Sequence, residues 1–202
     1  MIDYAELNPY AQVPSCTKCP LRGEGYAHPR IHRGSGPKVM FVGEGPGKEE
    51  AKQHLAFVGR AGKELDRWIE FLHIDNYFIT NIVRHRPTTP DGKKDRPPVE
   101  SEAKECLPYL MKEIMMEHPD FIIALGNEAV EEAFNLPISI SGAIDHFLAH
   151  EYYYFTDGTS RMIAFFHPSY VLRQKNAPSN VAQKFTMKFM HHLEQVREIV
   201  DG

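Results

Sequence analysis

The chain has 202 residues, of which 42% are hydrophobic and 25% are charged, and its formal net charge is −4. This length suits one well-buried domain, and the composition excludes a disordered chain and a membrane-spanning protein. The net charge argues against a uniformly basic DNA-binding domain. The first twenty residues lack the apolar run of an export signal, so we expect a protein of a reducing compartment, without a disulfide framework.

Four short apolar runs, each rich in β-branched and aromatic residues, follow one another along the chain. They are residues 38–43, 77–83, 121–126 and 161–167. Their near-continuous hydrophobicity predicts strands that are buried on both faces of a parallel sheet. The stretch "YYYF" (152–155) is either an extra strand or an aromatic patch over the core.

Helical patterns separate these runs, at residues 61–74, 99–118, 127–135 and 180–200. Pro108 lies inside the second pattern and predicts a kink or a break there. Because strands and helices alternate, the sequence predicts an α/β fold. We expect a three-layer α/β/α sandwich with a central, mostly parallel four-stranded sheet, formed by a single domain over residues 1–202.

Ligands of such sheets bind at the carboxyl ends of the strands, so the residues that follow the runs are the first candidates for a site. The glycine turn "GEGPG" (43–47) allows close backbone approach to a ligand, but its spacing does not fit the dinucleotide fingerprint. Asn81 and His167 end two of the other runs, and Phe57 follows the turn. An aromatic ring, an amide and an imidazole suit a planar ligand that forms hydrogen bonds.

Four motifs in chain order resemble the family 4 uracil-DNA glycosylases, the iron–sulfur branch of the uracil glycosylase superfamily. They are "GEGPGKEE…AFVGRAG", "TNIVRHRP…DRPPVESEAKEC", "ALG" and "HPSYVLR", and the resemblance extends from about Cys16 to Arg173. It implies an enzyme that hydrolyses the N-glycosidic bond of uracil flipped out of DNA, leaving an abasic site for base-excision repair. It further implies uracil-containing DNA as the partner and no membrane. We expect a cytoplasmic, nucleoid-associated monomer.

The resemblance also assigns roles to single residues. Phe57 would stack on the uracil, Asn81 would read its polar edge, and His167 would stabilise the departing uracil anion. Oriented hydrogen-bond donors are the main contribution to such a reaction, so no nucleophilic side chain is required. Glu44 and the backbone of Gly45 would shape the pocket, and Glu50 would position the water.

A loop after His167 would enter the duplex, with Tyr170 or Leu172 filling the gap that the base leaves. Arg173 would bind a phosphate, and the basic stretch from Arg84 to Arg96 would add further phosphate contacts. Charge alone, however, favours an ordinary solvated face for this stretch. The implied DNA-binding residues are Ser169, Tyr170, Leu172, Arg173, Arg84 and Arg86.

The family uses four cysteines to hold a [4Fe–4S] cluster, whereas this chain has Cys16, Cys19 and Cys106, with His85 at the remaining position. Imidazole ligates iron in other iron–sulfur centres, so these four residues are the implied ligands. The same set suits zinc. Alternatively, His85 points at a DNA phosphate and the metal site is incomplete or absent. A metal here would staple the N-terminal segment to the basic loop, which would let a mildly acidic protein hold DNA.

Two positions beside the expected pocket depart from the family pattern. Ala51 follows Glu50 where the family has an aspartate, and we expect it to weaken water positioning. His54 replaces a glycine, and we expect it to narrow the entrance and alter which base is accepted. Two other functions therefore stay open: a relative that excises or recognises another modified base, and a non-catalytic, metal-stapled DNA-binding module.

Overall fold

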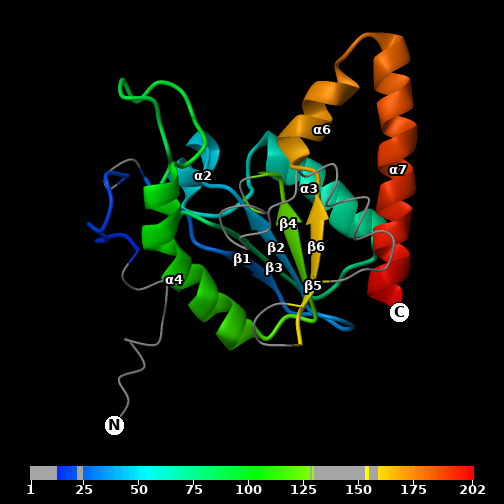
Figure 1. Ribbon diagram of the computed structural model, residues 1–202, viewed down its shortest axis with the longest axis horizontal. Coiled ribbons are helices and arrows are strands. Elements are labelled where there is room, and N and C mark those ends of the chain that lie inside the picture. Colours follow the sequence, from blue (N-terminus) through cyan, green and yellow to red (C-terminus); the bar gives the residue numbers. More distant parts are fainter. Residues whose placement is uncertain (1–12, 22–24, 128, 130–152, 155–158) are drawn as a thin grey trace.

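The computed structural model describes residues 13–21, 25–127, 129, 153–154 and 159–202. These residues form a six-stranded sheet of order β1-β3-β2-β4-β6-β5, flanked by helices (Figure 1). The strands are β1 (Arg30–His32), β2 (Val39–Gly43), β3 (Tyr77–Asn81), β4 (Phe121–Leu125), β5 (Tyr153–Tyr154) and β6 (Arg161–Phe165). The helices are α2 (Lys48–Gln53), α3 (Arg60–Phe71), α4 (Glu100–Glu117), α6 (Pro168–Lys175) and α7 (Ser179–Asp201).

The four predicted strands are β2, β3, β4 and β6, and they are parallel neighbours in the middle of the sheet. The expected number of four strands is wrong, because β1 and β5 add one short antiparallel strand at each edge. The strand β5 lies within the "YYYF" stretch, which decides between the two interpretations of that segment. The mostly parallel α/β architecture is confirmed.

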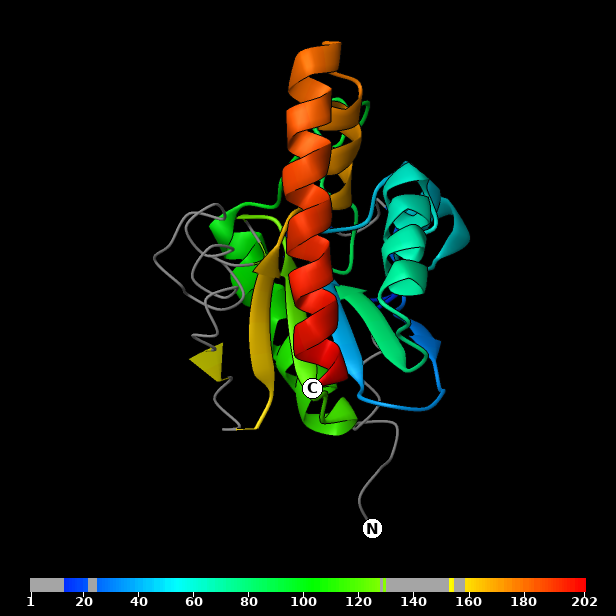
Figure 2. The same cartoon turned by 90° about the vertical axis from the view of Figure 1, so that its right-hand side faces the viewer.

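Helices cover both faces of the sheet: α4 lies on one side, and α3 and α7 lie on the other (Figure 2). Trp68 of α3 packs against Phe165 of β6 and Phe189 of α7, with ring centres 5.7 and 5.2 Å apart. The predicted kink or break at Pro108 is not a break, since α4 continues through this residue. The buried stripe of α4 outweighs the one hydrogen bond that a proline removes. Most of the helix predicted at 127–135 lies outside the described residues.

The segment that follows β6 is a helix, α6, and not the predicted loop. His167 caps it, because its Nδ1 accepts a hydrogen bond from the backbone N–H of Ser169 (3.1 Å), and Pro168 takes the first helical position. The far end of α6 is fastened to α3 by Lys175, whose Nζ lies 2.5 Å from Oε1 of the buried Glu64. The cap and the ion pair fix α6 at both ends.

The carboxylate of Glu64 has two further donors, since Trp68 Nε1 lies 3.1 Å from Oε1 and Arg67 Nη1 lies 2.9 Å from Oε2. Burial opposes ionisation of Glu64, but these hydrogen bonds and the one from Lys175 outweigh it and lower the pKa of Glu64. The anchor between α3 and α6 is therefore a charged one at neutral pH.

Within the described ranges, no helix has both the length and the apolar character needed to cross a membrane.

Candidate active site

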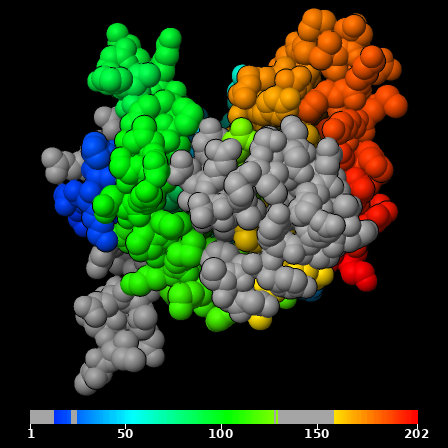
Figure 3. Space-filling view, viewed as in Figure 1, coloured from blue at the N-terminus to red at the C-terminus, as the bar shows by residue number. Residues whose placement is uncertain are grey.

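A cavity of about 860 Å³ opens at the carboxyl ends of the parallel strands. It lies between the 84–97 loop and the α6–α7 pair, which flank a hollow at the top of Figure 3. The parallel register brings Gly43 of β2 beside Asn81 of β3, and β6 leads directly into His167. The predicted residues that line the cavity are Glu44, Gly45, Glu50, Phe57, Asn81, His167, Ser169, Tyr170 and Arg173.

Gly43 lets Phe57 and Asn81 meet at the cavity wall. A Cβ atom at residue 43 would lie 2.5 Å from Cζ of Phe57 and 2.8 Å from Oδ1 of Asn81, so only glycine fits. Phe57 itself has a left-handed backbone (φ 54°), a strained conformation for a phenylalanine. Its carbonyl packs closely against Gly62 of α3, where a Cβ would lie 1.8 Å away. The surroundings thus hold the aromatic ring beside the amide.

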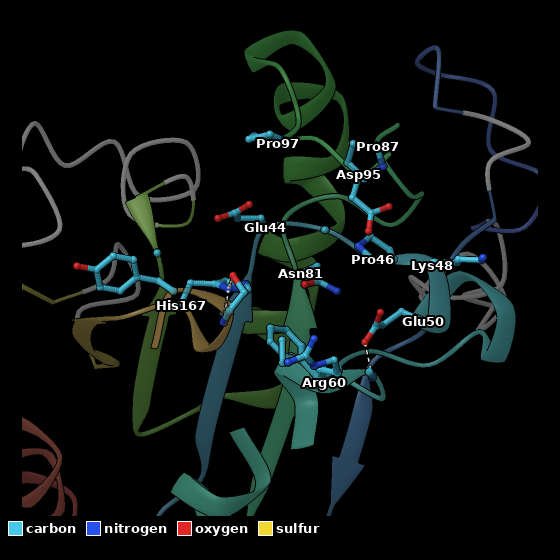
Figure 4. Close-up of a pocket in the computed structure, with 18 of the residues that line it drawn as sticks. Glu44, Pro46, Lys48, Glu50, Arg60, Asn81, Pro87, Asp95, Pro97 and His167 are labelled. Carbon is cyan, nitrogen blue, oxygen red and sulfur yellow. Dashed lines mark hydrogen bonds between the residues drawn. The ribbon is translucent and has the colours of Figure 1, made fainter. Parts of the chain in front are cut away.

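Asn81 presents an unsatisfied acceptor at this wall. Its side chain is 3% exposed, and within the described part of the chain its Oδ1 has no hydrogen-bond partner. A buried polar atom without a partner costs about 1–3 kcal/mol. Figure 4 shows the Asn81 side chain between His167 on one side and Glu50 on the other. A ligand that donates an N–H to Oδ1 would recover this energy.

The cap of α6 determines which ring nitrogen of His167 carries the hydrogen. A backbone N–H can only donate, so Nδ1 is the acceptor for Ser169, and the ring hydrogen lies on Nε2. The centres of the His167 and Phe57 rings are 6.0 Å apart. Gly126, with φ 94°, separates His167 from Glu44: a Cβ there would lie 3.2 Å from Cβ of His167 and 3.3 Å from Oε1 of Glu44. The imidazole and this carboxylate therefore share one wall.

Glu50 joins the two helices that begin at the cavity. Its Oε1 accepts a hydrogen bond from the backbone N–H of Gly59 (2.7 Å), and its Oε2 lies against Gly47 (Figure 4). This contact supports the turn that carries Phe57. Among the lining residues to which sequence reasoning gave no role are Lys48, Arg60, Asp95 and Phe166. The first three lie within the motifs and Phe166 directly precedes one, which is the signal that could have found them.

The predicted DNA contact of Arg84 and the alternative DNA contact of His85 do not fit the structure, because both side chains are buried. Arg84 is 2% exposed, and its Nη2 forms an ion pair with Oε2 of Glu113 (2.6 Å). His85 is 4% exposed, which also contradicts the alternative in which it faces a DNA phosphate. Arg86 forms an ion pair with Asp95 (2.6 Å) and lies outside the cavity lining.

The residues of α6 differ in how they face the cavity. Tyr170 is 36% exposed and lines it, whereas Leu172 is half-buried and does not. His54 also lies outside the lining, contrary to our expectation that it narrows the entrance. Its ring stacks on Tyr26 (centres 4.2 Å apart), and its Nδ1 lies 3.1 Å from the carbonyl oxygen of Tyr26.

The three cysteines lie near one another where the N-terminal segment packs on α4. Burial raises the pKa of Cys106, and the neighbouring thiols of Cys19 and Cys16 raise it further. The hydroxyl of Tyr109 donates to Sγ of Cys16 (3.9 Å), and burial together with Cys16 raises the pKa of Tyr109 to about 12. The three thiols are thus neighbours, with Cys16 and Cys19 in the N-terminal segment and Cys106 in α4.

His85 is buried beside the N-terminal segment. Its ring packs against Tyr26, with centres 6.1 Å apart, and burial alone lowers its pKa. Across the described ranges, no group of three or more His, Cys, Asp and Glu side chains has the geometry to hold a metal ion. The donor types fit an iron–sulfur cluster or zinc.

Comparison with known proteins gives a consistent family. The family model described as "Uracil DNA glycosylase superfamily" matches residues 32–193. The chain is 33% identical to the type-4 uracil-DNA glycosylase of Thermotoga maritima over 180 residues, which are 82% of each chain. It is 38% identical to that of Sulfurisphaera tokodaii over 135 residues, which are 61% of this chain and 56% of the relative. The chain thus matches little more than half of the length of the second relative. The family model, in contrast, matches most of this chain. The chain belongs to the uracil DNA glycosylase superfamily.

Proposed function

We propose that this chain is a uracil-DNA glycosylase, which hydrolyses the N-glycosidic bond of a uracil flipped out of DNA. One observation carries the proposal: Phe57, Asn81 and His167 line a single cavity, with the Asn81 Oδ1 acceptor unsatisfied among the described residues. The Phe57 ring offers a stacking surface for a planar base. The N3–H of uracil satisfies Oδ1 of Asn81, whereas cytosine has an acceptor at N3 and would leave two acceptors facing each other. The amide thus selects uracil over cytosine.

The chemistry follows from where the charges develop. Negative charge grows on the uracil oxygens as the bond breaks, and the Nε2–H of a neutral His167 donates to one of them. The cap that holds Nδ1 as an acceptor keeps the hydrogen on Nε2, so no reorganisation is needed during the reaction. The sugar becomes positive, and the carboxylates of Glu44 and Glu50 complement that charge. Since Oε1 of Glu50 is engaged by Gly59, its Oε2 is the atom that positions the water.

DNA would lie across the mouth of the cavity against α6. Tyr170 is the side chain that fills the gap in the duplex, because it is exposed at the rim and supported from below by Phe166 (ring centres 5.8 Å apart, 19° between planes). The guanidinium of Arg173 lies over the Tyr170 ring (5.9 Å) and is exposed for a phosphate. Ser169 lines the same rim.

The direct test is strand cleavage at uracil. The protein is incubated with an end-labelled oligonucleotide that contains one uracil and is then treated with hot alkali, which breaks the strand at an abasic site. We expect cleavage at the uracil position and none with cytosine or thymine at that position. Cleavage at 5-hydroxymethyluracil alone would support the relative with another base preference. Stable binding without cleavage of any substrate would leave only the non-catalytic DNA-binding module.

We further propose that Cys16, Cys19 and Cys106 hold an iron–sulfur cluster with His85 as the fourth ligand, as the resemblance to family 4 implies. The gathered thiols and the buried imidazole support the donor set. A cluster would have a structural role and fasten the N-terminal segment to α4. This proposal is independent of the uracil chemistry, which uses no residue of the set.

Purified protein is expected to be brown, with broad visible absorption that Cys106→Ser removes. His85→Ser is expected to lose colour and to lower the unfolding temperature, because a ligand is lost. His191→Ser, at an exposed position of α7, is the matched control and should keep both. Colourless protein with bound zinc would replace the cluster by a zinc site. Full colour in His85→Ser would remove His85 from the ligands.

A further inference from the structure

Two cations on the cavity wall have no assigned role. Lys48 and Arg60 both line the cavity and are exposed. Neither side chain has an ion pair or a hydrogen bond within the part of the chain that the structure describes. Other basic residues nearby are already engaged. Arg96 makes two hydrogen bonds to the carboxylate of Glu102 (2.8 and 2.7 Å), and Arg86 is paired with Asp95. Lys48 and Arg60 are thus available to a negatively charged ligand.

The place of these residues in their helices is unfavourable for a cation. Lys48 is the first residue of α2 and Arg60 is the first residue of α3. A positive side chain in the first turn opposes the helix dipole, at a cost of about 0.3–1 kcal/mol. Local folding therefore gives no reason for a cation at either position, whereas an anion bound over the cavity would.

The two cations are held in a fixed relation to the proposed base pocket. Glu50 accepts the N–H of Gly59, the residue before Arg60, and packs against Gly47, the residue before Lys48. The starts of α2 and α3 are thereby joined. In Figure 4, Lys48 and Glu50 lie on the side of Asn81 away from His167. Arg173 of α6, the helix that His167 caps, lines the same cavity. Positive charge therefore borders the cavity from α2, α3 and α6.

We propose that Lys48 and Arg60 bind phosphates of the DNA strand that carries the extruded base. The inference rests on the proposed function, since it takes that DNA as the ligand. One stretch of backbone lies against Arg173, and the stretch on the other side of the extruded nucleotide lies against Lys48 and Arg60. Phosphate contacts position a strand without reading its sequence. Contacts on both sides hold the backbone while the base is out of the stack.

The test compares two double variants with the same change in net charge. K48Q/R60Q removes both proposed contacts. K52Q/K63Q removes two exposed lysines of the same two helices that lie outside the cavity lining. Binding of a single-stranded oligonucleotide with a stable abasic analogue is measured by fluorescence anisotropy across a range of salt. The slope of log K against log salt is negative, and each lost phosphate contact reduces its magnitude by about 0.7. In K48Q/R60Q the magnitude of the slope should therefore fall by about 1.4. K52Q/K63Q should keep the wild-type slope.

Thermal unfolding separates this role from a structural one. Because the two cations oppose the helix dipoles, K48Q/R60Q should unfold at the same temperature as the wild type or a higher one. Equal slopes in the wild type and K48Q/R60Q, or equal losses in both double variants, would overturn the inference. If the wild type excises uracil and the slopes are equal, only this inference fails. If the wild type neither excises uracil nor binds the oligonucleotide, the proposed function fails with it.

Discussion

Replacing His167 by alanine is expected to lower the rate of uracil excision by about 10²–10³-fold, the loss typical of removing one donor to a developing anion. The alanine variant also loses the cap of α6, which costs about 1 kcal/mol of stability. His167→Ser separates the two effects, because a serine hydroxyl still caps the helix. We expect the same loss of rate in His167→Ser with nearly wild-type stability. Single-turnover excision rates and thermal unfolding measure the two quantities.

Ser169→Ala is the matched control for this experiment. It removes the hydroxyl that lies 2.8 Å from Nδ1 of His167 but keeps the backbone N–H that holds the ring. The imidazole keeps its orientation, so the excision rate should fall much less than in the His167 variants. An active His167→Ser enzyme would contradict the role of the imidazole. A Ser169→Ala enzyme as slow as His167→Ser would transfer the main contribution to the hydroxyl.

The central sheet was predictable because burial on both faces leaves a plain signal. The strands β2, β3, β4 and β6 end within two residues of the predicted runs, since each consists mainly of apolar residues packed between helices. The edge strand β1 gave no such signal, because it is only three residues long ("RIH") and two of them are polar. It forms where Arg30 pairs with Ile79 of β3, so its existence depends on a neighbour 49 positions away.

The predicted site followed from the same rule, since parallel strands bring their carboxyl ends to one edge. Asn81 and His167 were found in this way, and Phe57 was found because it follows the glycine turn. The rule says nothing about pairing between distant side chains. Arg84 and Arg86 look alike in "VRHRP", and only the fold places Glu113 of α4 beside the first of them. The absence of partners at Lys48 and Arg60, among the described residues, is likewise visible only in three dimensions.

The pair of Arg84 and Glu113 is expected to carry the largest single contribution to stability that we predict. Glu113 is completely buried, and its Oε2 lies 2.6 Å from Nη2 of Arg84 and 2.9 Å from Oγ1 of Thr80. Burial raises the pKa of Glu113 to about 7, although the charge of Arg84 opposes the rise. Arg84→Met leaves the carboxylate buried without its cation, which costs about 3–5 kcal/mol. Chemical denaturation at pH 8, where the carboxylate is charged in the pair, measures this loss.

The double variant R84M/E113L decides whether the loss comes from the pair. Replacing both charges by apolar side chains of similar size is often nearly neutral, so the double variant should be more stable than Arg84→Met alone. If the loss of stability in R84M/E113L equals the sum of the losses in Arg84→Met and Glu113→Leu, the two residues are not a coupled pair. The salt dependence of DNA binding should not change in Arg84→Met, because the buried Arg84 contacts no phosphate. If the magnitude of the slope of log K against log salt falls by about 0.7, Arg84 does contact a phosphate.

Arg84 also connects Asn81, the proposed base-reading residue, to the cysteines. Its Nη1 donates to the backbone oxygen of Asn81 (2.7 Å), and its backbone N–H donates to the thiol of Cys106. Removing the guanidinium therefore loosens the strand end that holds the amide against Phe57. We expect slower uracil excision in Arg84→Met even at temperatures where the variant is folded, with the loss mainly in kcat. R84M/E113L should recover stability but not this rate, since the bond to Asn81 is still missing.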